Sequence, residues 1–547
     1  MDFETDILII GGGVGGCACA LAACKEGLKV VMTEETDWIG GQFTTQATPP
    51  DEHGWIEKHG CTASYRQFRE DVRHFYRDNY PLDANSFIKT KRDSNEAKNS
   101  PLLNPGNGWV SPLCAEPKVF LSVLENTLRP FIDAKQLTLL KKHIPISSNT
   151  EAETSGRYVH NVSIKNVETF EIITVSAKYF IDATELGDLL PLTNTAFVTG
   201  SESQAETGEP SAKAEANPQN VQAFSMCFAM SYHEGEDWTI EKPEKYDYYR
   251  NFIPNLTPAW PGRLLSLTGL SPRTLQPVHY TFDPQNEPNK AFAGLWTYRR
   301  ILHKENFKKG AFDSDITLVN YPQIDFLGGD LISASYSERE RLIAEAKQQS
   351  LSFLYYLQTE MGFKGLKLRP DVMDTKDGLA KSPYIRESRR IKAEFTIFEQ
   401  HISAKHRPNC RYAKRFSDSI GVGFYRIDLH PSLGGDNYVD VESLPYQIPL
   451  GALIPVNTEN ILPACKNIGT THITNGCYRL HPIEWNIGEA VGYLVSYCLK
   501  NNLTPRQVRN VPDILRGYQK MLKKQGVEIS WKKGLKLEEG DPHIHAM

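Results

Sequence analysis

The start of the chain alternates short apolar runs with glycine and polar breaks. After Asp6, residues 7–10 (ILII) form a continuous apolar run that leads directly into a glycine cluster at 11–16. An alanine-rich stretch over 17–27 follows, and then LKVVMTE at 28–34, with an apolar run at its centre. Uninterrupted apolar runs are typical of parallel strands, which are buried on both faces. The pattern predicts strand, glycine turn, helix and strand, that is, a βαβ unit.

Further along, the pattern predicts a helix, a strand and then a β-meander. Residues 116–132 carry apolar positions at helical spacing, and the runs QLTLL, YVHNVSIKN and FEIITVSAKYFIDAT have the composition of strands. Residues 83–107 and 201–220 are polar and predict loops. The order of elements indicates an α/β protein.

Two more helices are predicted in the second half. One covers residues 336–361, with Ser337 as the cap and Glu340 closing a capping box. The other runs from Thr504 and Pro505 to about Gly526. Residues 191–445 mix aromatic-rich strands with helices and contain no second glycine fingerprint.

Composition excludes several function classes. The 547 residues include 61 Lys+Arg and 66 Asp+Glu, which gives a net charge of −5 without a long basic stripe. We therefore expect neither nucleic acid nor a membrane as a partner. The ten cysteines form no CxxC pair, so we expect no metal centre and a reducing, cytoplasmic location. No apolar stretch is long enough for a membrane helix, and the N-terminus lacks the basic start of a secretory signal.

The glycine cluster fits GxGxxG and lies between a predicted strand and a predicted helix, as the dinucleotide fingerprint requires. Gly11 permits the tight turn, Gly13 lets the backbone approach a pyrophosphate, and Gly16 lets the helix lie close to the strand. The helix N-terminus then favours the negative phosphates. The alternative interpretation is a glycine turn unrelated to any nucleotide.

Glu34 ends the second predicted strand roughly 18 residues after Gly16, close to the spacing of about 20 that is typical of the acid that binds a ribose hydroxyl. A carboxylate at this position repels a 2′-phosphate. These residues therefore favour FAD or NAD over NADP, and they do not distinguish FAD from NAD.

Four segments together resemble the FAD-dependent oxidoreductases of the glutathione-reductase-like superfamily, and most closely the single-chain bacterial family called FAD-dependent oxidoreductase. They are DILIIGGGVGG with Glu34, WIGGQ at 38–42, FIDATELGDL at 180–189 and NGCYRLHPIEWNIGEAVG at 475–492. The resemblance covers nearly the whole chain. It implies a Rossmann-like FAD-binding domain, with a parallel sheet and a β-meander, over 1–190 and 446–547. Residues 191–445 would be an inserted α+β substrate domain.

The resemblance also implies which residues contact FAD. The glycines of the fingerprint would hold the pyrophosphate, Glu34 the adenosine ribose, and the second glycine loop the ribityl chain. A C-terminal helix beginning near Asn486 would point its N-terminus at the flavin. The implied set is Gly11, Gly13, Gly16, Glu34, Gly41, Gln42, Ile144, Asp182, Asn486 and Gly488. Ile144 is expected on the strand after the first long helix. Asp182 belongs to a DAT motif that the family often follows directly with glycine, whereas Glu185 and Leu186 intervene here.

Three histidines lie near the segments that the resemblance places against the flavin. They are His430, His472 and His481. Flavin oxidation of a C–H bond beside O–H or N–H often needs a base for the second proton, so each histidine is a candidate base. The alternative for each is a structural, hydrogen-bonded histidine.

Tyr478 and Arg479 share the segment with two of these histidines. Arg479 could bind a carboxylate or the reduced flavin, or be paired with Glu484 or Asp428. Cys477 could be a redox or covalent flavin partner, or simply packed. A set of three arginines could bind an anionic substrate or be salt-bridged; it is Arg386, Arg389 and Arg390, and on a helix the first and last would share a face. A set of aromatic residues could line a substrate pocket or belong to the core; it is Trp109, Trp296, Tyr298, Phe424, Tyr425 and Tyr446.

The sequence thus predicts an FAD-dependent oxidoreductase that moves a hydride from a small organic substrate to flavin and then to oxygen or another acceptor. The lack of a second dinucleotide fingerprint argues against a disulfide-reductase type of enzyme. A hydroxylase that uses NAD(P)H and a non-catalytic flavin-binding protein remain alternatives. The oligomeric state is left open.

Overall fold

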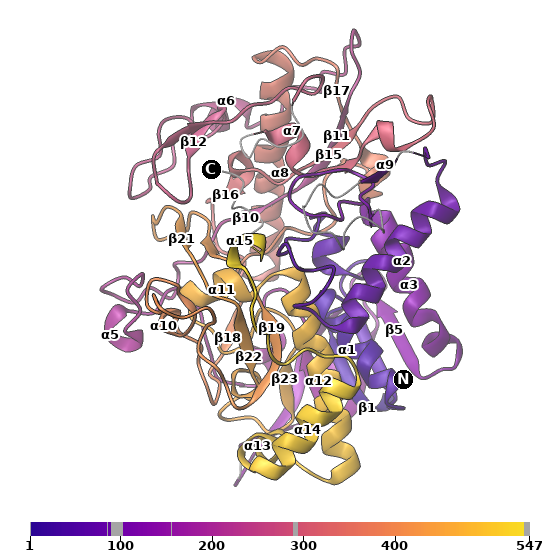
Figure 1. The fold of residues 1–547 in the computed structure, drawn as a ribbon, viewed down its shortest axis with the longest axis vertical. Coiled ribbons are helices and arrows are strands. Elements are labelled where there is room, and N and C mark those ends of the chain that lie inside the picture. Colours follow the sequence, from indigo (N-terminus) through magenta and orange to yellow (C-terminus); the bar gives the residue numbers. More distant parts are fainter. Residues whose placement is uncertain (1, 85, 89–101, 155, 288–293, 541–547) are drawn as a thin grey trace.

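The computed structural model describes residues 2–84, 86–88, 102–154, 156–287 and 294–540. Part of the predicted loop 83–107 lies outside these residues. In Figure 1 the indigo N-terminal elements and the yellow helix α12 (His481–Asn501) lie side by side, and the second sheet with helix α8 (Tyr336–Thr359) lies above them. Elements from the two ends of the chain therefore share one part of the molecule.

The main sheet has a parallel core that draws on both ends of the sequence. Its order is β5-β2-β1-β8, with β23 added beside the carboxyl half of β8. The bounds are β1 (Asp2–Ile10), β2 (Val30–Glu34), β5 (Leu137–Lys141), β8 (Ile172–Asp182) and β23 (Ile461–Pro463). Helix α1 (Val14–Lys25) joins β1 to β2, so the predicted βαβ unit is confirmed. All strand pairs in this core are parallel.

The β-meander is also present. β6 (His143–Glu153) and β7 (Gly156–Asn166) pair antiparallel, and β7 continues onto the amino half of β8. The strand that follows helix α3 (Pro117–Asp133) is β5, so Ile144 lies one strand later than expected, on β6 opposite Lys165. The reason is that the chain turns at Lys142, a residue with positive φ, immediately after β5.

A second sheet forms in the middle of the chain. It is antiparallel, in the order β14-β15-β11-β17, with bounds Arg300–Leu302, Ile316–Val319, Phe228–Tyr232 and Leu366–Leu368. Helix α8 belongs to the same hydrophobic core: Phe353, Leu354 and Leu357 of the helix cluster with Phe228 and Met230 of β11. This core is distinct from the cores on the two faces of the main sheet. The fold class is therefore α/β, with a Rossmann-like sheet and a second α+β unit.

Helix α12 packs directly on α1. A Cβ atom at Gly488 would lie 2.0 Å from the carbonyl oxygen of Gly15, and one at Gly15 would lie 1.6 Å from that of Ala464. Glycine at these positions lets the backbones touch. The prediction that this helix begins near Asn486 is wrong. It begins at His481, because Pro482 suits the first turn of a helix.

Two other helix boundaries differ from the prediction. Helix α8 is capped by Ser335, whose side chain accepts the N–H of Glu338, so the expected cap at Ser337 is wrong. The single helix expected over 504–526 is two helices, α13 (Pro505–Asn510) and α14 (Pro512–Lys524). Pro512 lacks the N–H needed to continue the first one. The predicted loop 201–220 contains one turn of helix, α5 (Gln204–Thr207).

The remaining elements are short connections or packing helices. The helices are α2 (Ala63–Asn79), α4 (Leu189–Leu192), α6 (Tyr246–Asn251), α7 (Leu295–Tyr298), α9 (Pro370–Met373), α10 (Glu399–Ile402), α11 (His472–Tyr478) and α15 (Leu537–Gly540). The strands are β3 (Phe87–Ile88), β4 (Leu102–Leu103), β9 (Phe197–Val198), β10 (Phe224–Ser225), β12 (Thr268–Leu270), β13 (Pro277–His279), β16 (Asp325–Phe326), β18 (Arg390–Ile391), β19 (Ser419–Gly423), β20 (Ile427–Leu429), β21 (Val439–Val441) and β22 (Tyr446–Pro449). Among the described residues, no helix has the length and apolar character needed to cross a membrane.

Candidate active site

Gly11 and Gly13 lie in the turn after β1, and Gly16 lies in the first turn of α1. A Cβ atom at Gly11 would lie 2.4 Å from the carbonyl oxygen of Ala183, and one at Gly16 would lie 2.0 Å from that of Gly11. Gly13 differs, because the nearest atom to its Cβ position is a side-chain oxygen of Glu185, at 3.1 Å. Two glycines thus permit close packing, and the third keeps a surface of the turn clear of backbone.

Glu34 ends β2 beside this turn and is almost fully buried. One carboxylate oxygen accepts the N–H of Gly12 at 3.1 Å, and the other accepts the N–H and the hydroxyl of Thr36 at 2.9 Å each. Burial raises the pKa of Glu34 to about 7. The structure therefore places this acid against the glycine turn, as the spacing predicts.

The second glycine loop, at Gly40 and Gly41, lies against the first. The N–H of Gly40 donates to the carbonyl of Gly12 at 2.8 Å, and a Cβ atom at Gly41 would lie 3.0 Å from the Cα of Gly13. The next residue, Gln42, donates from Nε2 to the carbonyl oxygen of Arg479 at 3.0 Å. A continuous path thus leads from the fingerprint to the segment before α12.

Asp182, at the end of β8, uses its carboxylate to fold the loop that follows. It accepts the N–H and hydroxyl of Thr184, at 3.0 and 2.7 Å, and the N–H of Leu189 at 3.1 Å. Asn486 and Gly488 lie inside α12, where Asn486 donates to the carbonyl of Ile420. These three residues make contacts within the chain, and their expected contacts with a cofactor stay predictions.

His481 is the first residue of α12, and the chain itself occupies both of its ring nitrogens. Nδ1 accepts the N–H of Asp51 at 3.3 Å, so Nε2 carries the proton and donates to the carbonyl of Thr48 at 3.2 Å. Burial lowers the pKa of His481 to about 4, and its ring packs on Phe43 with centroids 4.7 Å apart. This histidine has the contacts of a structural residue.

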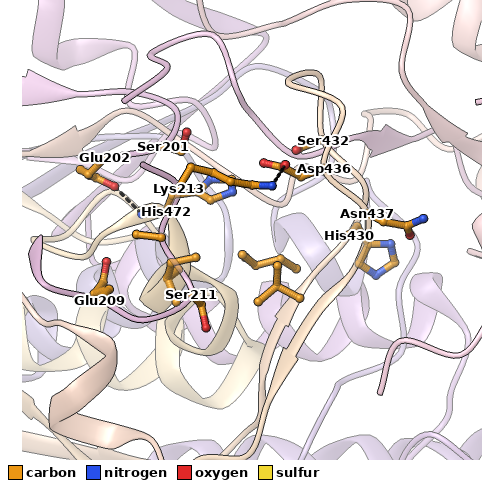
Figure 2. A pocket seen from close by; sticks show the side chains of 14 residues that line it. Ser201, Glu202, Glu209, Ser211, Lys213, His430, Ser432, Asp436, Asn437 and His472 are labelled. Carbon is orange, nitrogen blue, oxygen red and sulfur yellow. Dashed lines mark hydrogen bonds and ion pairs between the residues drawn. The ribbon is translucent and has the colours of Figure 1, made fainter. Parts of the chain in front are cut away.

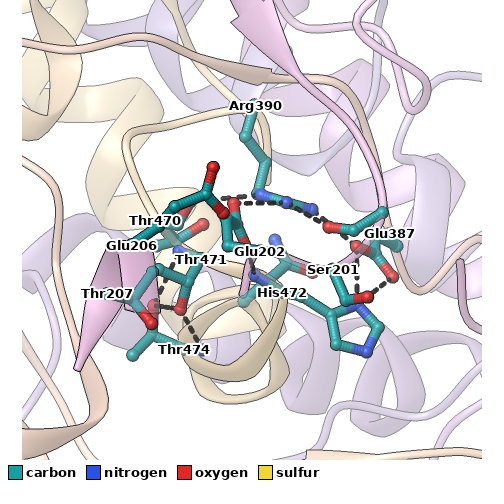
Figure 3. Close-up of polar contacts among 12 residues, drawn as sticks. Ser201, Glu202, Glu206, Thr207, Glu387, Arg390, Thr470, Thr471, His472 and Thr474 are labelled. Carbon is teal, nitrogen blue, oxygen red and sulfur yellow. Dashed lines mark hydrogen bonds and ion pairs between the residues drawn. The ribbon is translucent and has the colours of Figure 1, made fainter. Parts of the chain in front are cut away.

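His472, the first residue of α11, is paired with a buried carboxylate (Figure 3). Its Nδ1 lies 2.9 Å from Oε1 of Glu387, which also accepts Nη1 of Arg390 at 2.5 Å. Burial is the largest single effect and opposes the charged form of His472, but the charge and the hydrogen bond of Glu387, together with the charge of Glu202, outweigh it and raise the pKa of the imidazole above its usual value. His472 therefore favours the protonated, cationic form.

His430 is paired with a different carboxylate. Its Nδ1 lies 2.7 Å from Oδ2 of Asp325, and Asp325 also forms an ion pair of 3.0 Å with Arg386. His430 and His472 line one cavity, which Figure 2 shows with Lys213 and Asp436 at its edge. Two histidines far apart in sequence thus face one space, each with a carboxylate behind it.

Arg479 and Tyr478 differ in their surroundings. Arg479 donates to the hydroxyl of Tyr384 and to the carbonyl of Asp428, both at 3.1 Å, so of the two expected partners the structure has Asp428 and not Glu484. Tyr478 is fully buried and donates to the carbonyl of Gln447 at 2.8 Å. Tyr478 is therefore part of the core, whereas Arg479 has a charged and aromatic environment.

The comparison with known proteins decides the family. The sequence model described as FAD dependent oxidoreductase matches residues 6–522. The chain belongs to this family. It is an FAD-dependent oxidoreductase, and FAD is its cofactor.

Curated relatives of this FAD-dependent oxidoreductase match over short segments. The mitochondrial glycerol-3-phosphate dehydrogenase of Rattus norvegicus is 53% identical over 38 residues, which are 7% of this chain and 5% of that protein. The hydroxyneurosporene desaturase of Rhodobacter capsulatus is 43% identical over 49 residues, 9% of this chain and 10% of that protein. The chain thus spans a tenth or less of the length of these relatives.

Solved structures align over most of the chain at low similarity. A geranylgeranyl bacteriochlorophyll reductase-like protein from Thermoplasma acidophilum is 11% identical, with a TM-score of 0.30, over 96% of this chain and 85% of that one. The flavin-dependent monooxygenase PieE is 11% identical, with a TM-score of 0.32, over 96% and 63%. The myxobacterial halogenase CndH is 9% identical, with a TM-score of 0.33, over 96% and 80%.

The residues of this FAD-dependent oxidoreductase fit its cofactor. Gly13 keeps the turn open, and Glu34 is buried beside it. Among the described residues, the buried acceptors Gln42 Oε1, Glu185 Oε1 and Asn475 Oδ1 have no hydrogen-bond partner. Buried acceptors without partners are rare in folded proteins, and the ribose and ribityl hydroxyls of FAD are suitable donors.

Sequence reasoning missed a buried charge cluster beside the two glycine loops. Lys466, which is fully buried, forms ion pairs with Glu185 and with Oε1 of Glu484, the latter at 3.1 Å. Glu185 reaches the loops, since its Oε1 lies 3.0 Å from the Cβ position of Gly41. Only the unusual Glu185 in the DATELGD run pointed to this cluster, because Lys466 lies 281 residues later.

The helix on which Arg386 and Arg390 would share a face does not form. Residues 385–389 belong to no helix and lead into β18, and each of the three arginines has its own acid. Arg386 pairs with Asp325, Arg389 with Asp188 at 3.1 Å, and Arg390 with Glu387. Cys477 is buried, and burial raises the pKa of its thiol far above the usual range, so it has the environment of a packed cysteine.

The aromatic residues divide into two groups. Trp296 and Tyr446 belong to hydrophobic core clusters, and Phe424 stacks on Trp55 at 5.2 Å. Tyr298 and Tyr425 differ, because both lie within electrostatic reach of the guanidinium group of Arg299. The sequence did not single out Arg299.

Proposed function

We propose that this FAD-dependent oxidoreductase removes two electrons and two hydrogens from a small organic substrate, and that His430 accepts the proton. The observation that carries the proposal is the pairing of His430 Nδ1 with Asp325 at 2.7 Å, on the wall of a cavity. A carboxylate at Nδ1 fixes the tautomer in which Nε2 is a free base.

FAD supplies the two-electron acceptor that takes the other hydrogen as a hydride. Gly13, Gly41 and Gln42 would hold its phosphates and ribityl chain, and Glu34 its adenosine ribose. We infer that its binding domain is discontinuous, over 1–190 and 446–547, with 191–445 inserted. The joining of β23 to β8 in one parallel sheet supports this division, and the same sheet with its meander supports membership of the glutathione-reductase-like superfamily.

His472 would provide a positive charge on the same cavity wall. Glu387 favours its protonated form, and a protonated imidazole has no lone pair with which to accept a further proton.

The test is an anaerobic screen of alcohols, amines, amino acids and hydroxy acids for bleaching of the bound flavin. A substrate that bleaches the flavin without NAD(P)H supports the proposal. Bleaching by NADPH alone or with a candidate substrate would instead support a hydroxylase. A flavin that no organic compound and no NAD(P)H reduces would indicate a non-catalytic flavoprotein.

Replacement of His430 tests its role. With a substrate identified by the screen, His430→Asn should slow flavin reduction by roughly 100-fold or more, since general base catalysis contributes on that scale. The variant should still bind FAD. His406→Asn is the matched control, because His406 is exposed. If His430→Asn reduces its flavin as fast as the wild type and His472→Asn does not, the assignment passes to His472.

A further inference from the structure

Two buried arginines beside the start of α12 retain unused hydrogen-bonding capacity. Arg299 follows α7 and is 9% exposed, and Arg479 precedes α12 and is 3% exposed. Nε and Nη1 of Arg299, and Nε of Arg479, have no hydrogen-bond partner among the described residues. Buried donors are nearly always paired in folded proteins, so these three atoms indicate a bound acceptor.

The two guanidinium groups belong to one cluster. Asp51, Tyr384 and Tyr425 each act electrostatically on both of them. We call these five residues the arginine cluster. The hydroxyl of Tyr384 accepts Nη1 of Arg479 at 3.1 Å, and all five side chains are buried. The unused donors are therefore concentrated in one place.

The arginine cluster adjoins the segments that would contact the flavin. The N–H of Asp51 donates to His481, at the start of α12, and Gln42 of the second glycine loop donates to the carbonyl of Arg479. It also adjoins the proposed base, because Oδ2 of Asp428 lies 3.6 Å from Nη2 of Arg479 and 4.0 Å from Nε2 of His430. A small molecule could thus reach both the cluster and His430.

Asp51, the acidic residue of the arginine cluster, does not accept a hydrogen bond from Arg299. Oδ1 of Asp51 lies 3.5 Å from Nη1 of Arg299, too long for a hydrogen bond, and has no other hydrogen-bond partner among the residues that the structure describes. The cluster therefore has both N–H donors, on the two arginines, and an acceptor, Oδ1 of Asp51, without a hydrogen-bond partner among the described residues. A planar carboxylate matches guanidinium donors, and Asp51 matches a hydroxyl or amino group.

We infer that the arginine cluster binds the carboxylate of the substrate, and that the substrate is a small acid with a hydroxyl or amino group on the neighbouring carbon. This inference rests on the proposed function and specifies its substrate class. In the reaction the proton of the hydroxyl or amino group would go to His430, and bound FAD would supply the acceptor for the hydride from the neighbouring carbon. The product is the corresponding keto or imino acid, so atoms and electrons balance.

The test uses the FAD-loaded protein and a readout other than turnover. Acetate, lactate and alanine are titrated beside acetamide, lactamide and alaninamide, and binding is measured from perturbation of the flavin absorbance spectrum and from thermal stabilisation. At least one acid should bind roughly 10-fold or more tightly than its amide, as expected for hydrogen bonds to charged groups. Arg299→Met should abolish this preference, and Arg299→Lys should restore part of it.

Arg516→Gln is the matched control, because Arg516 is exposed and, within the described part of the chain, its one ion pair is with Asp513 on its own helix. Equal binding of every acid and its amide overturns the inference, and so does an unchanged preference in Arg299→Met. If Arg299→Met does not bind FAD, the inference is tested by the wild type alone, from its affinities for each acid and the corresponding amide.

The result also separates this inference from the proposed function. Tight acid binding without flavin reduction by any compound supports the arginine cluster and contradicts the proposed function. Reduction by a neutral substrate without any preference for acids supports the function and overturns the inference.

Discussion

Nδ1 of His430 lies 2.7 Å from Oδ2 of Asp325, although the two residues are 105 positions apart in the sequence. Asp325 also pairs with Arg386 and accepts the hydroxyl of Ser225 at 2.9 Å. The carboxylate is therefore held in place from several sides, and it can orient the imidazole.

Removal of this carboxylate should impair the proposed base without removing it. We expect Asp325→Asn to slow substrate-driven flavin reduction by roughly 10-fold or more, less than His430→Asn, because the imidazole remains but loses its fixed tautomer. The double variant should be no slower than His430→Asn. Stopped-flow absorbance measures the rate of flavin reduction in the two single variants and the double variant. If the rate decreases of the single variants multiply in the double variant, the two side chains act separately.

Glu387 should control the charge of His472. We expect Glu387→Gln to lower the pKa of His472 to or below its ordinary value, because burial still opposes the charge while the carboxylate is gone. In the wild type the raised pKa contributes stability that is fully present below the unfolded value of about 6.5 and is lost as pH rises through the folded value. Histidine NMR titration measures the shift, and an unchanged pKa of His472 would contradict the assignment.

Glu209 should make stability depend on pH. Burial raises its pKa to about 7, although Thr471 donates its hydroxyl and Glu399 its N–H to the carboxylate. A raised pKa means that the stabilisation is present below pH 4.5 and is lost as pH rises to 7. Glu209→Gln should therefore become more stable than the wild type over this window, by up to about 3 kcal/mol. Urea unfolding at several pH values measures the free energy of unfolding, with Glu215→Gln as the control because Glu215 is exposed. If this free energy depends on pH in the same way in the wild type and in Glu209→Gln, Glu209 is not the cause of the pH dependence.

Lys466 should support FAD binding. It is the cation that balances Glu185 and Glu484 beside the glycine loops. We expect Lys466→Met to weaken FAD binding by roughly 10-fold or more, because the buried Glu484 and the partly buried Glu185 are then left beside the glycine loops without their positive charge. Release of FAD fluorescence on dilution measures the affinity. The double variant Lys466→Met with Glu185→Gln should bind FAD more tightly than Lys466→Met alone. Equal affinities of these two variants would argue against the electrostatic role of Lys466.

The contact between α1 and α12 should not tolerate a side chain. We expect Gly488→Ala to destabilise the protein by about 2–3 kcal/mol, because its Cβ would lie 2.0 Å from the carbonyl oxygen of Gly15. Gly310→Ala is the control, since nothing lies within 4 Å of its Cβ position and only its positive φ is strained, at about 1 kcal/mol. Thermal unfolding compares them, and equal losses of stability would show that the helix contact adapts.

What the sequence determined by itself was local. The apolar run over 7–10, the glycines at 11–16 and Glu34 predicted the βαβ unit and the acid beside the turn, because the contacts that define them, β1 with β2 and Glu34 with Gly12, form within one short unit of chain. The start of α12 was predicted near Asn486 and lies at His481. Gly488, inside that helix, packs against α1, and its expected contact with the cofactor stays a prediction.

Only the tertiary structure decided which side chains meet at the site. His430 with Asp325, His472 with Glu387, and Lys466 with Glu185 are separated by 105, 85 and 281 positions. The arginine cluster likewise combines Asp51 and Tyr384 with Arg299 just after α7, Tyr425, and Arg479 just before α12. Such pairings depend on how separate layers pack, and periodicity along the chain reports only the burial of each element. The physical reason is that charge and hydrogen bonding act through space, so their partners are fixed only once the chain has folded.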